Sequence, residues 1–149
     1  MSDLRELYQE VIIDHGRHPR NFGALADANH HQEGFNPLCG DKIILYVKAI
    51  NGILEKIRFE GCGCAISIAS ASLMIETLQG KTVQQSEAMF TAFHDLVMEG
   101  RVSENLGKLE VLGSVRAFPM RVKCATLAWH TLKAALTNNA SSVCTEETI

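Results

Sequence analysis

Residues 42–80, KIILYVKAINGILEKIRFEGCGCAISIASASLMIETLQG, carry the strongest structural signals in the sequence. Two runs rich in β-branched and aromatic residues flank Asn51-Gly52, the dipeptide that most favours a two-residue hairpin turn. The pattern therefore predicts an antiparallel hairpin over about residues 42–60. The small and apolar residues that follow keep a helical spacing for four turns and stop at Gly80. We expect a buried helix there rather than another strand.

Helical periodicity recurs on both sides of this stretch. We expect further helices over residues 2–16, 82–99 and 118–136, a short strand near 30–35, and a helical turn with a loop over 101–117. Thr82 is a candidate N-cap, and Pro119 suits the first turn of a helix. These elements predict an α+β fold in a single domain, residues 1–136. The polar and aperiodic residues 137–149 are expected to form a disordered tail.

The composition is that of an ordinary globular domain. The chain has 149 residues, of which 46% are hydrophobic and 21% charged, and its formal net charge is -3. No basic stripe indicates nucleic acid as a partner. No apolar run approaches the roughly 20 residues of a membrane span, and the N-terminus is charged where a secretory signal is apolar. We therefore expect a cytoplasmic protein that binds neither nucleic acid nor a membrane.

The five cysteines raise the question of function. A disulfide framework is disfavoured in a reducing compartment, so metal binding or thiol chemistry becomes the leading interpretation. Cys39, Cys62, Cys64 and Cys124 lie near the ends of expected elements, whereas Cys144 lies in the tail and is set aside. Cys64 precedes a helix, whose free N–H groups and positive dipole end favour thiolate over thiol. Soft metals and sulfur transfer both require a thiolate.

Asp41 extends the candidate thiol site. It follows Cys39 with one glycine between them, so an extended backbone turns the carboxylate and the thiolate toward the same point. Cys39, Asp41, Cys64 and Cys124 would offer three sulfurs and one oxygen to a tetrahedral ion such as zinc. Because closed structural zinc sites use cysteine and histidine, the aspartate indicates a site that opens. We expect Asp41 to tune ligand exchange rather than to support the core.

Simpler interpretations of the same residues stay open. Cys124 lies on an apolar helical stripe and suits the role of a small buried hydrophobe, while Arg121 and Lys123 suit a solvated helix face as well as thiolate support. The G-C-G-C run lacks the third glycine of a dinucleotide-binding loop, because Ile66 stands there, and its cysteines are too close for a C-x-x-C knuckle. The six histidines are scattered, and we expect them on the surface or in loops rather than as ligands.

Four ordered motifs carry a family resemblance. They are LYQEVIIDHGRHPRNFG, NPLCGD, GCAISIASASLM and FPMRVKCATLAW, and together they span about residues 4–136. They resemble the U-type iron-sulfur cluster assembly proteins, which comprise the NifU N-terminal domains and IscU, and most closely the SufU branch. The resemblance implies a SufE/NifU-like α+β fold, in which a small antiparallel sheet of about three strands packs against helices.

The resemblance also implies a site and an activity. The metal ligands fall on Cys39, Asp41, Cys64 and Cys124, and the SufU branch implies Zn²⁺ and the acceptance of persulfide sulfur from a PLP-dependent, SufS-like cysteine desulfurase. In the other branches the same three cysteines assemble a nascent [2Fe-2S] cluster from iron, which passes to apo iron-sulfur proteins or downstream carriers. Lys123 replaces a histidine of the scaffold branch, and the long stretch between Cys64 and Cys124 is also SufU-like.

Three hypotheses follow for the function: a zinc-dependent sulfur acceptor, an iron-sulfur scaffold, or a plain structural zinc module. The serine-rich helix fixes the register of the resemblance on Cys64 rather than Cys62, so we expect Cys62 and Cys144 to be dispensable. Cys39 lies on a loop whose glycine permits movement, which makes it the expected sulfur acceptor. Cys124, held by a helix, is the alternative acceptor.

Overall fold

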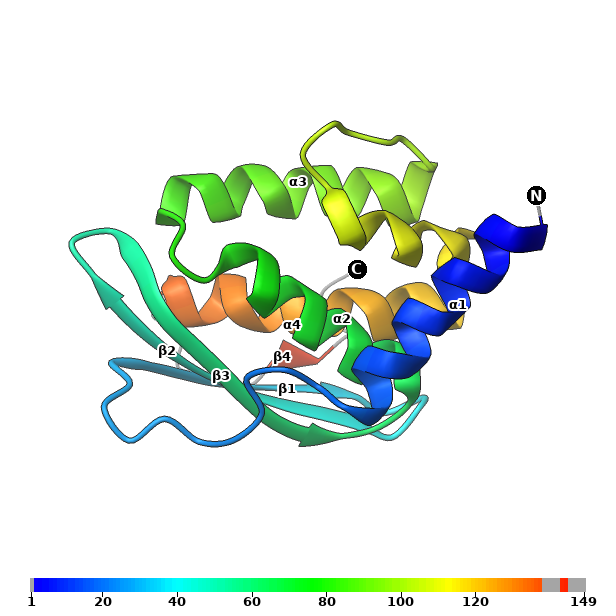
Figure 1. The fold of residues 1–149 in the computed structure, drawn as a ribbon. Coiled ribbons are helices and arrows are strands. Elements are labelled where there is room, and N and C mark those ends of the chain that lie inside the picture. Colours follow the sequence, from blue (N-terminus) through cyan, green and yellow to red (C-terminus); the bar gives the residue numbers. More distant parts are fainter. Residues whose placement is uncertain (1, 138–142, 145–149) are drawn as a thin grey trace.

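A computed structural model describes residues 2–137 and 143–144 of the chain. In chain order the elements are α1 (Ser2–Arg17), β1 (His30–Asn36), β2 (Asp41–Ile50), β3 (Ile53–Cys62), α2 (Ala65–Leu78), α3 (Val83–Glu99), the 3₁₀ helix η1 (Gly107–Ala117), α4 (Pro119–Leu136) and β4 (Val143–Cys144). The expected α+β architecture is confirmed, with helices gathered over one face of a small sheet (Figure 1).

The sheet is built around the predicted hairpin. Strands β2 and β3 pair antiparallel, and Asn51 and Gly52 both have positive φ angles, 54° and 78°, as a tight hairpin turn of this kind requires. Strand β1 pairs antiparallel with the other side of β2, from His30 opposite Val47 to Asn36 opposite Asp41. The three antiparallel strands implied by the family resemblance are thus present.

A short fourth strand completes the order β3-β2-β1-β4. Residues Val143–Cys144 run parallel to β1, beside Gly34 and Phe35. The sequence pattern gave no signal for this strand, which falls within the expected disordered tail. The other residues of that tail, 138–142 and 145–149, lie outside the described residues.

The helices cover one face of the sheet because the strands alternate. Ile43, Leu45 and Val47 of β2 are fully buried, whereas the residues between them are partly exposed. Helices α2 and α4 pack on this buried face, α1 packs against α2, and α3 lies farther from the sheet, over α4 and η1 (Figure 1). Helix α2 is buried along most of its length, which explains why its sequence lacks a polar stripe.

Helices α3 and α4 start at their predicted signals. Thr82 caps α3 in a reciprocal capping box with Gln85, and Gly100 ends that helix in the left-handed conformation. Pro119 opens α4 as expected. Between them the chain forms a longer 3₁₀ helix than the turn and loop that we expected, because its apolar residues are buried. None of the helices among the described residues has the length and apolar character needed to cross a bilayer.

The seam between β1 and α4 depends on Gly34. A Cβ built at this position would collide with Thr131 of α4, which is itself fully buried. Glycine therefore allows α4 to pack directly against β1. This strand leads to the turn that carries Cys39.

Gly34→Ala should therefore lower the free energy of unfolding by about 1–3 kcal/mol, the usual cost of overpacking a core. Urea unfolding of the metal-free protein measures this loss. In a Thr131→Ala background the same change should cost clearly less, since the colliding side chain is gone. Equal losses of unfolding free energy in both backgrounds would mean that the contact between Gly34 and Thr131 is not what excludes a larger side chain at position 34.

Candidate metal centre

Three of the four predicted site residues converge at one end of the sheet. Ligand atoms of Cys39, Asp41 and Cys124 all lie within 4.8 Å of one another. Cys39 comes from the turn after β1, Asp41 begins β2, and Cys124 lies in the second turn of α4. The fold thus brings together Cys39 and Cys124, which lie 85 positions apart in the sequence.

Cys64, the fourth predicted residue, lies beside this group. Its Sγ is 3.9 Å from Asp41 Oδ2, and it also accepts the backbone N–H of Ser67 at 3.5 Å, so that the thiol is the N-cap of α2. Cys62 lies at the exposed end of β3. Cys144 lies on β4 with its backbone opposite Phe35.

The buried carboxylate of Asp41 links the parts of the site. Asp41 is only 2% exposed, and its Oδ1 accepts the backbone N–H of Cys64 at 2.8 Å. The same residue lies against Gly63, whose φ of +150° and lack of a Cβ leave room for the carboxylate. Asp41 thus takes the position of the reciprocal acceptor in a capping box, supplied here by a strand. Beside the ligand-exchange role expected from the sequence, Asp41 therefore has a structural contact with the start of α2.

Asn36 and Ser67 belong to the site although the sequence reasoning did not single them out. The Asn36 amide Nδ2 donates to Asp41 Oδ2 at 3.2 Å and to Cys124 Sγ at 3.3 Å. Ser67 is fully buried, and its hydroxyl has no hydrogen-bond partner among the described residues. Asn36 opens the NPLCGD motif, which was the available signal. Ser67 was hidden among the other small residues of α2.

The thiols of Cys64 and Cys124 have opposite tendencies to ionise. A hydrogen bond with Cys124 lowers the pKa of Cys64 to about 7, and the backbone N–H of Ser67 contributes in the same direction. The shared bond raises the pKa of Cys124, and burial adds to that effect. Cys64 is therefore the thiolate of the pair near neutral pH, as expected for a thiol at a helix N-terminus.

These residues fit a tetrahedral zinc ion. Three sulfurs and one carboxylate oxygen form an acceptable donor set, since ligand atoms of Cys39, Asp41 and Cys124 lie within 4.8 Å of one another and the Cys64 sulfur lies 3.9 Å from the Asp41 carboxylate. Backbone and amide N–H groups face the ligand atoms, as is usual around bound metals. The histidines are not part of this cluster. His15, expected at the surface, is instead buried and hydrogen-bonded to Ser72 Oγ at 2.7 Å.

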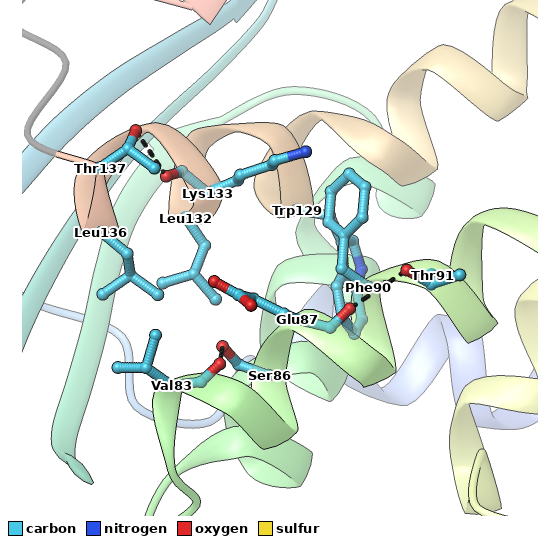
Figure 2. A pocket seen from close by; sticks show the side chains of 10 residues that line it. All are labelled: Val83, Ser86, Glu87, Phe90, Thr91, Trp129, Leu132, Lys133, Leu136 and Thr137. Atoms are coloured by element: carbon cyan, nitrogen blue, oxygen red, sulfur yellow. Dashed lines mark hydrogen bonds between the residues drawn. The ribbon is translucent and has the colours of Figure 1, made fainter. Parts of the chain in front are cut away.

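A cavity of about 320 Å³ lies elsewhere, between α3 and α4 (Figure 2). Its lining is largely apolar and contains no cysteine. The hydroxyls of Ser86, Thr91 and Thr137 are bound to carbonyls of their own helices, and Lys133 Nζ lies 5.0 Å from the centre of the Phe90 ring (Figure 2). Because these hydroxyls are satisfied within their own helices, the cavity shows no group of converging thiols comparable to the cysteine cluster.

Two substitutions of Asp41 should separate its structural role from its charge. Asp41→Ala leaves the Cys64 N–H and the Asn36 amide without this acceptor, so it should lower the free energy of unfolding of metal-free protein by about 1–3 kcal/mol. Asp41→Asn keeps an acceptor oxygen for the Cys64 N–H and should cost less than half as much. Chemical denaturation measures both. An alanine variant as stable as the native protein would refute the capping role.

Comparison with known proteins places this arrangement in a family. Residues 7–145 match the family described as NifU-like N terminal domain. The chain is 43% identical over 135 residues to the zinc-dependent sulfurtransferase SufU of Bacillus subtilis (strain 168), which covers 89% of this chain and 90% of that protein. It is 39% identical over 144 residues to the iron-sulfur cluster assembly scaffold protein IscU of Streptococcus pyogenes serotype M1, covering 95% and 90%.

Solved structures agree with the sequence relatives. The crystal structure of FiSufU from Fervidobacterium islandicum AW-1, described as a candidate iron-sulfur cluster assembly scaffold protein for the SUF system, superposes with a TM-score of 0.83. That protein is 36% identical, and the match covers 89% of this chain and 98% of its own. A NifU-like protein from Brucella abortus, 20% identical with a TM-score of 0.82, shares the fold. The fold, the length of the family match and the sequence identities agree: the chain belongs to the family of NifU-like N-terminal domains.

Proposed function

We propose that this protein is a zinc-dependent sulfur acceptor in iron-sulfur cluster assembly. In this role it takes persulfide sulfur from a PLP-dependent cysteine desulfurase in the cytoplasm, where thiols stay reduced. The observation that carries the proposal is the convergence of Cys39, Asp41 and Cys124 within 4.8 Å, with Cys64 beside them. The similarity to a protein named as a zinc-dependent sulfurtransferase supports it.

The residues that would hold the ion are Cys39, Asp41, Cys64 and Cys124. A bound zinc ion supplies positive charge that keeps its sulfur ligands as thiolates and holds them at one point. Cys64 fits the fourth ligand position better than Cys62. Its sulfur lies 3.9 Å from the Asp41 carboxylate, whereas Cys62 is exposed at the end of β3.

Differences in exposure favour Cys39 as the sulfur acceptor. Cys124 is 1% exposed, so a donor persulfide on another protein has no direct access to it. Cys39 is partly exposed on the turn at residues 37–40, between the exposed Leu38 and Gly40, whose φ is +68°. Glycine at that angle lets the turn rearrange, and Leu38, 52% exposed, offers a docking partner an apolar contact.

The transfer step needs no external oxidant or reductant. A thiolate held by zinc is a weak nucleophile, so Cys39 would first leave the ligand set, and a group of the docked desulfurase would take its place. The free Cys39 thiolate attacks the terminal sulfur of the desulfurase persulfide and forms a new S–S bond. The S–S bond of the donor breaks, and the desulfurase cysteine leaves as a thiolate that takes up a proton. Cys39 then carries the persulfide, which downstream carriers or apo iron-sulfur proteins draw on.

The second candidate function is a scaffold for a nascent [2Fe-2S] cluster. It is favoured by the similarity to a protein named as an iron-sulfur cluster assembly scaffold, and Cys39, Cys64 and Cys124 are the sulfurs that would hold the cluster. Metal analysis of anaerobically purified protein decides between the two. Colourless protein with one zinc per chain supports the acceptor, whereas brown protein with iron and sulfide supports the scaffold.

Cysteine substitutions should sort the ligands from their neighbours. Cys64→Ser removes a proposed ligand and should weaken zinc binding by at least about tenfold in a chelator competition, by the scale of losses seen at metal sites. Cys62→Ser and Cys144→Ser should leave zinc binding unchanged and serve as matched controls. Loss of zinc in the Cys62→Ser variant, with retention in Cys64→Ser, would show that Cys62 is the ligand and that the assignment to Cys64 is wrong.

Persulfide mapping should identify the acceptor. When the protein is incubated with its desulfurase and cysteine, then alkylated and digested, mass spectrometry should find the added sulfur on the Cys39 peptide. Cys39→Ser should abolish sulfur acceptance while the fold is kept, because this side chain lies on a surface turn. Sulfur found on Cys124 alone, with Cys39 unmodified, would contradict the assignment and favour Cys124, the alternative acceptor.

A further inference from the structure

Asn36 lies at the end of β1 and is fully buried, directly before the turn that carries Cys39. Its amide Nδ2 donates to Asp41 Oδ2 at 3.2 Å and to Cys124 Sγ at 3.3 Å. One side chain therefore contacts two ligand atoms, one from β2 and one from α4. We propose that Asn36 is a positioning residue that holds Asp41 and Cys124 in the geometry for metal binding, an inference that rests on the proposed function.

The charge of the ligand set explains why such a donor is needed. Three thiolates and one carboxylate carry more negative charge than a divalent ion neutralises, and Asp41 and Cys124 are almost fully shielded from water. Hydrogen-bond donors must stabilise the excess charge, and bonds to charged acceptors are the strongest of their kind. Backbone N–H groups of Cys64 and Ser67 provide part of this stabilisation. Asn36 adds a side-chain donor, which a substitution can remove.

The backbone of Asn36 has a separate role at the same place. Its carbonyl accepts the N–H of Cys39 at 3.3 Å and so anchors the start of the turn at residues 37–40. A change of side chain leaves this bond in place. Asn36 therefore holds two ligands through its side chain and the acceptor turn through its backbone, and substitution tests the first role alone.

The test compares Asn36→Ala with Gln32→Ala. Gln32 is a buried amide on the same face of β1, four residues from Asn36, and it lies opposite Leu45 rather than opposite the site. Asn36→Ala should raise the zinc dissociation constant about 10–100-fold in a chelator competition. It should also shift the thiolate-to-metal absorption bands of the Co²⁺-loaded protein, because a sulfur loses its N–H donor. Gln32→Ala should leave both readouts at the native values, even where it lowers stability.

A measurement on the native protein keeps the inference testable if Asn36→Ala does not fold. In protein labelled with ¹⁵N-asparagine, zinc should shift the side-chain amide resonances of Asn36 more than those of Asn29, whose amide donates to the Ala49 carbonyl far from the cysteines. An Asn36 resonance that zinc leaves unmoved overturns the inference.

The outcomes separate this inference from the proposed function. Native protein that binds neither zinc nor cobalt overturns the proposed function and this inference with it. Native binding that Asn36→Ala leaves unchanged, in affinity and in the cobalt spectrum, overturns the positioning role alone. Equal effects of Asn36→Ala and Gln32→Ala would show a general loss of packing and would also reject it.

Discussion

The buried carboxylate of Asp41 is the constraint on which the functional end of the molecule depends. It accepts the first free N–H of α2, from Cys64, and contacts the amide of Asn36 at the end of β1. A buried carboxylate without such donors would be costly, so the strand, the helix and the glycine beside them must keep their positions together. Asp41 and Cys64, the two residues whose side chains cap the helix, are also two of the residues offered to a metal.

This arrangement explains how a distant helix completes the site. Ser70 of α2 donates to the Ala125 carbonyl of α4 at 2.5 Å and accepts the Trp129 indole N–H at 3.2 Å. These bonds fix the position of α4 along α2, and Cys124 immediately precedes the bonded carbonyl. Ser70 of α2 therefore helps to place the buried thiol of Cys124 next to Asp41.

Local signals made most of the fold predictable. The hairpin followed from Asn51-Gly52, and the start of α3 followed from Thr82, because each depends on residues only a few positions apart. Strand β4 and the length of η1 were not predictable, since both depend on packing against residues far away in the sequence. Likewise Cys39, Asp41 and Cys124 were found from motifs, whereas the Asn36 contact to Cys124 spans 88 positions.

The central claim is that the converging residues form a zinc site with three sulfur ligands and one oxygen. Zinc K-edge X-ray absorption of protein purified without oxygen tests it most directly, because the method counts sulfur and light-atom ligands separately. The account predicts one zinc per chain, bound by three sulfurs at about 2.3 Å and one oxygen at about 2.0–2.2 Å. Iron with inorganic sulfide in place of zinc, or zinc bound by four sulfurs without Asp41, would contradict it.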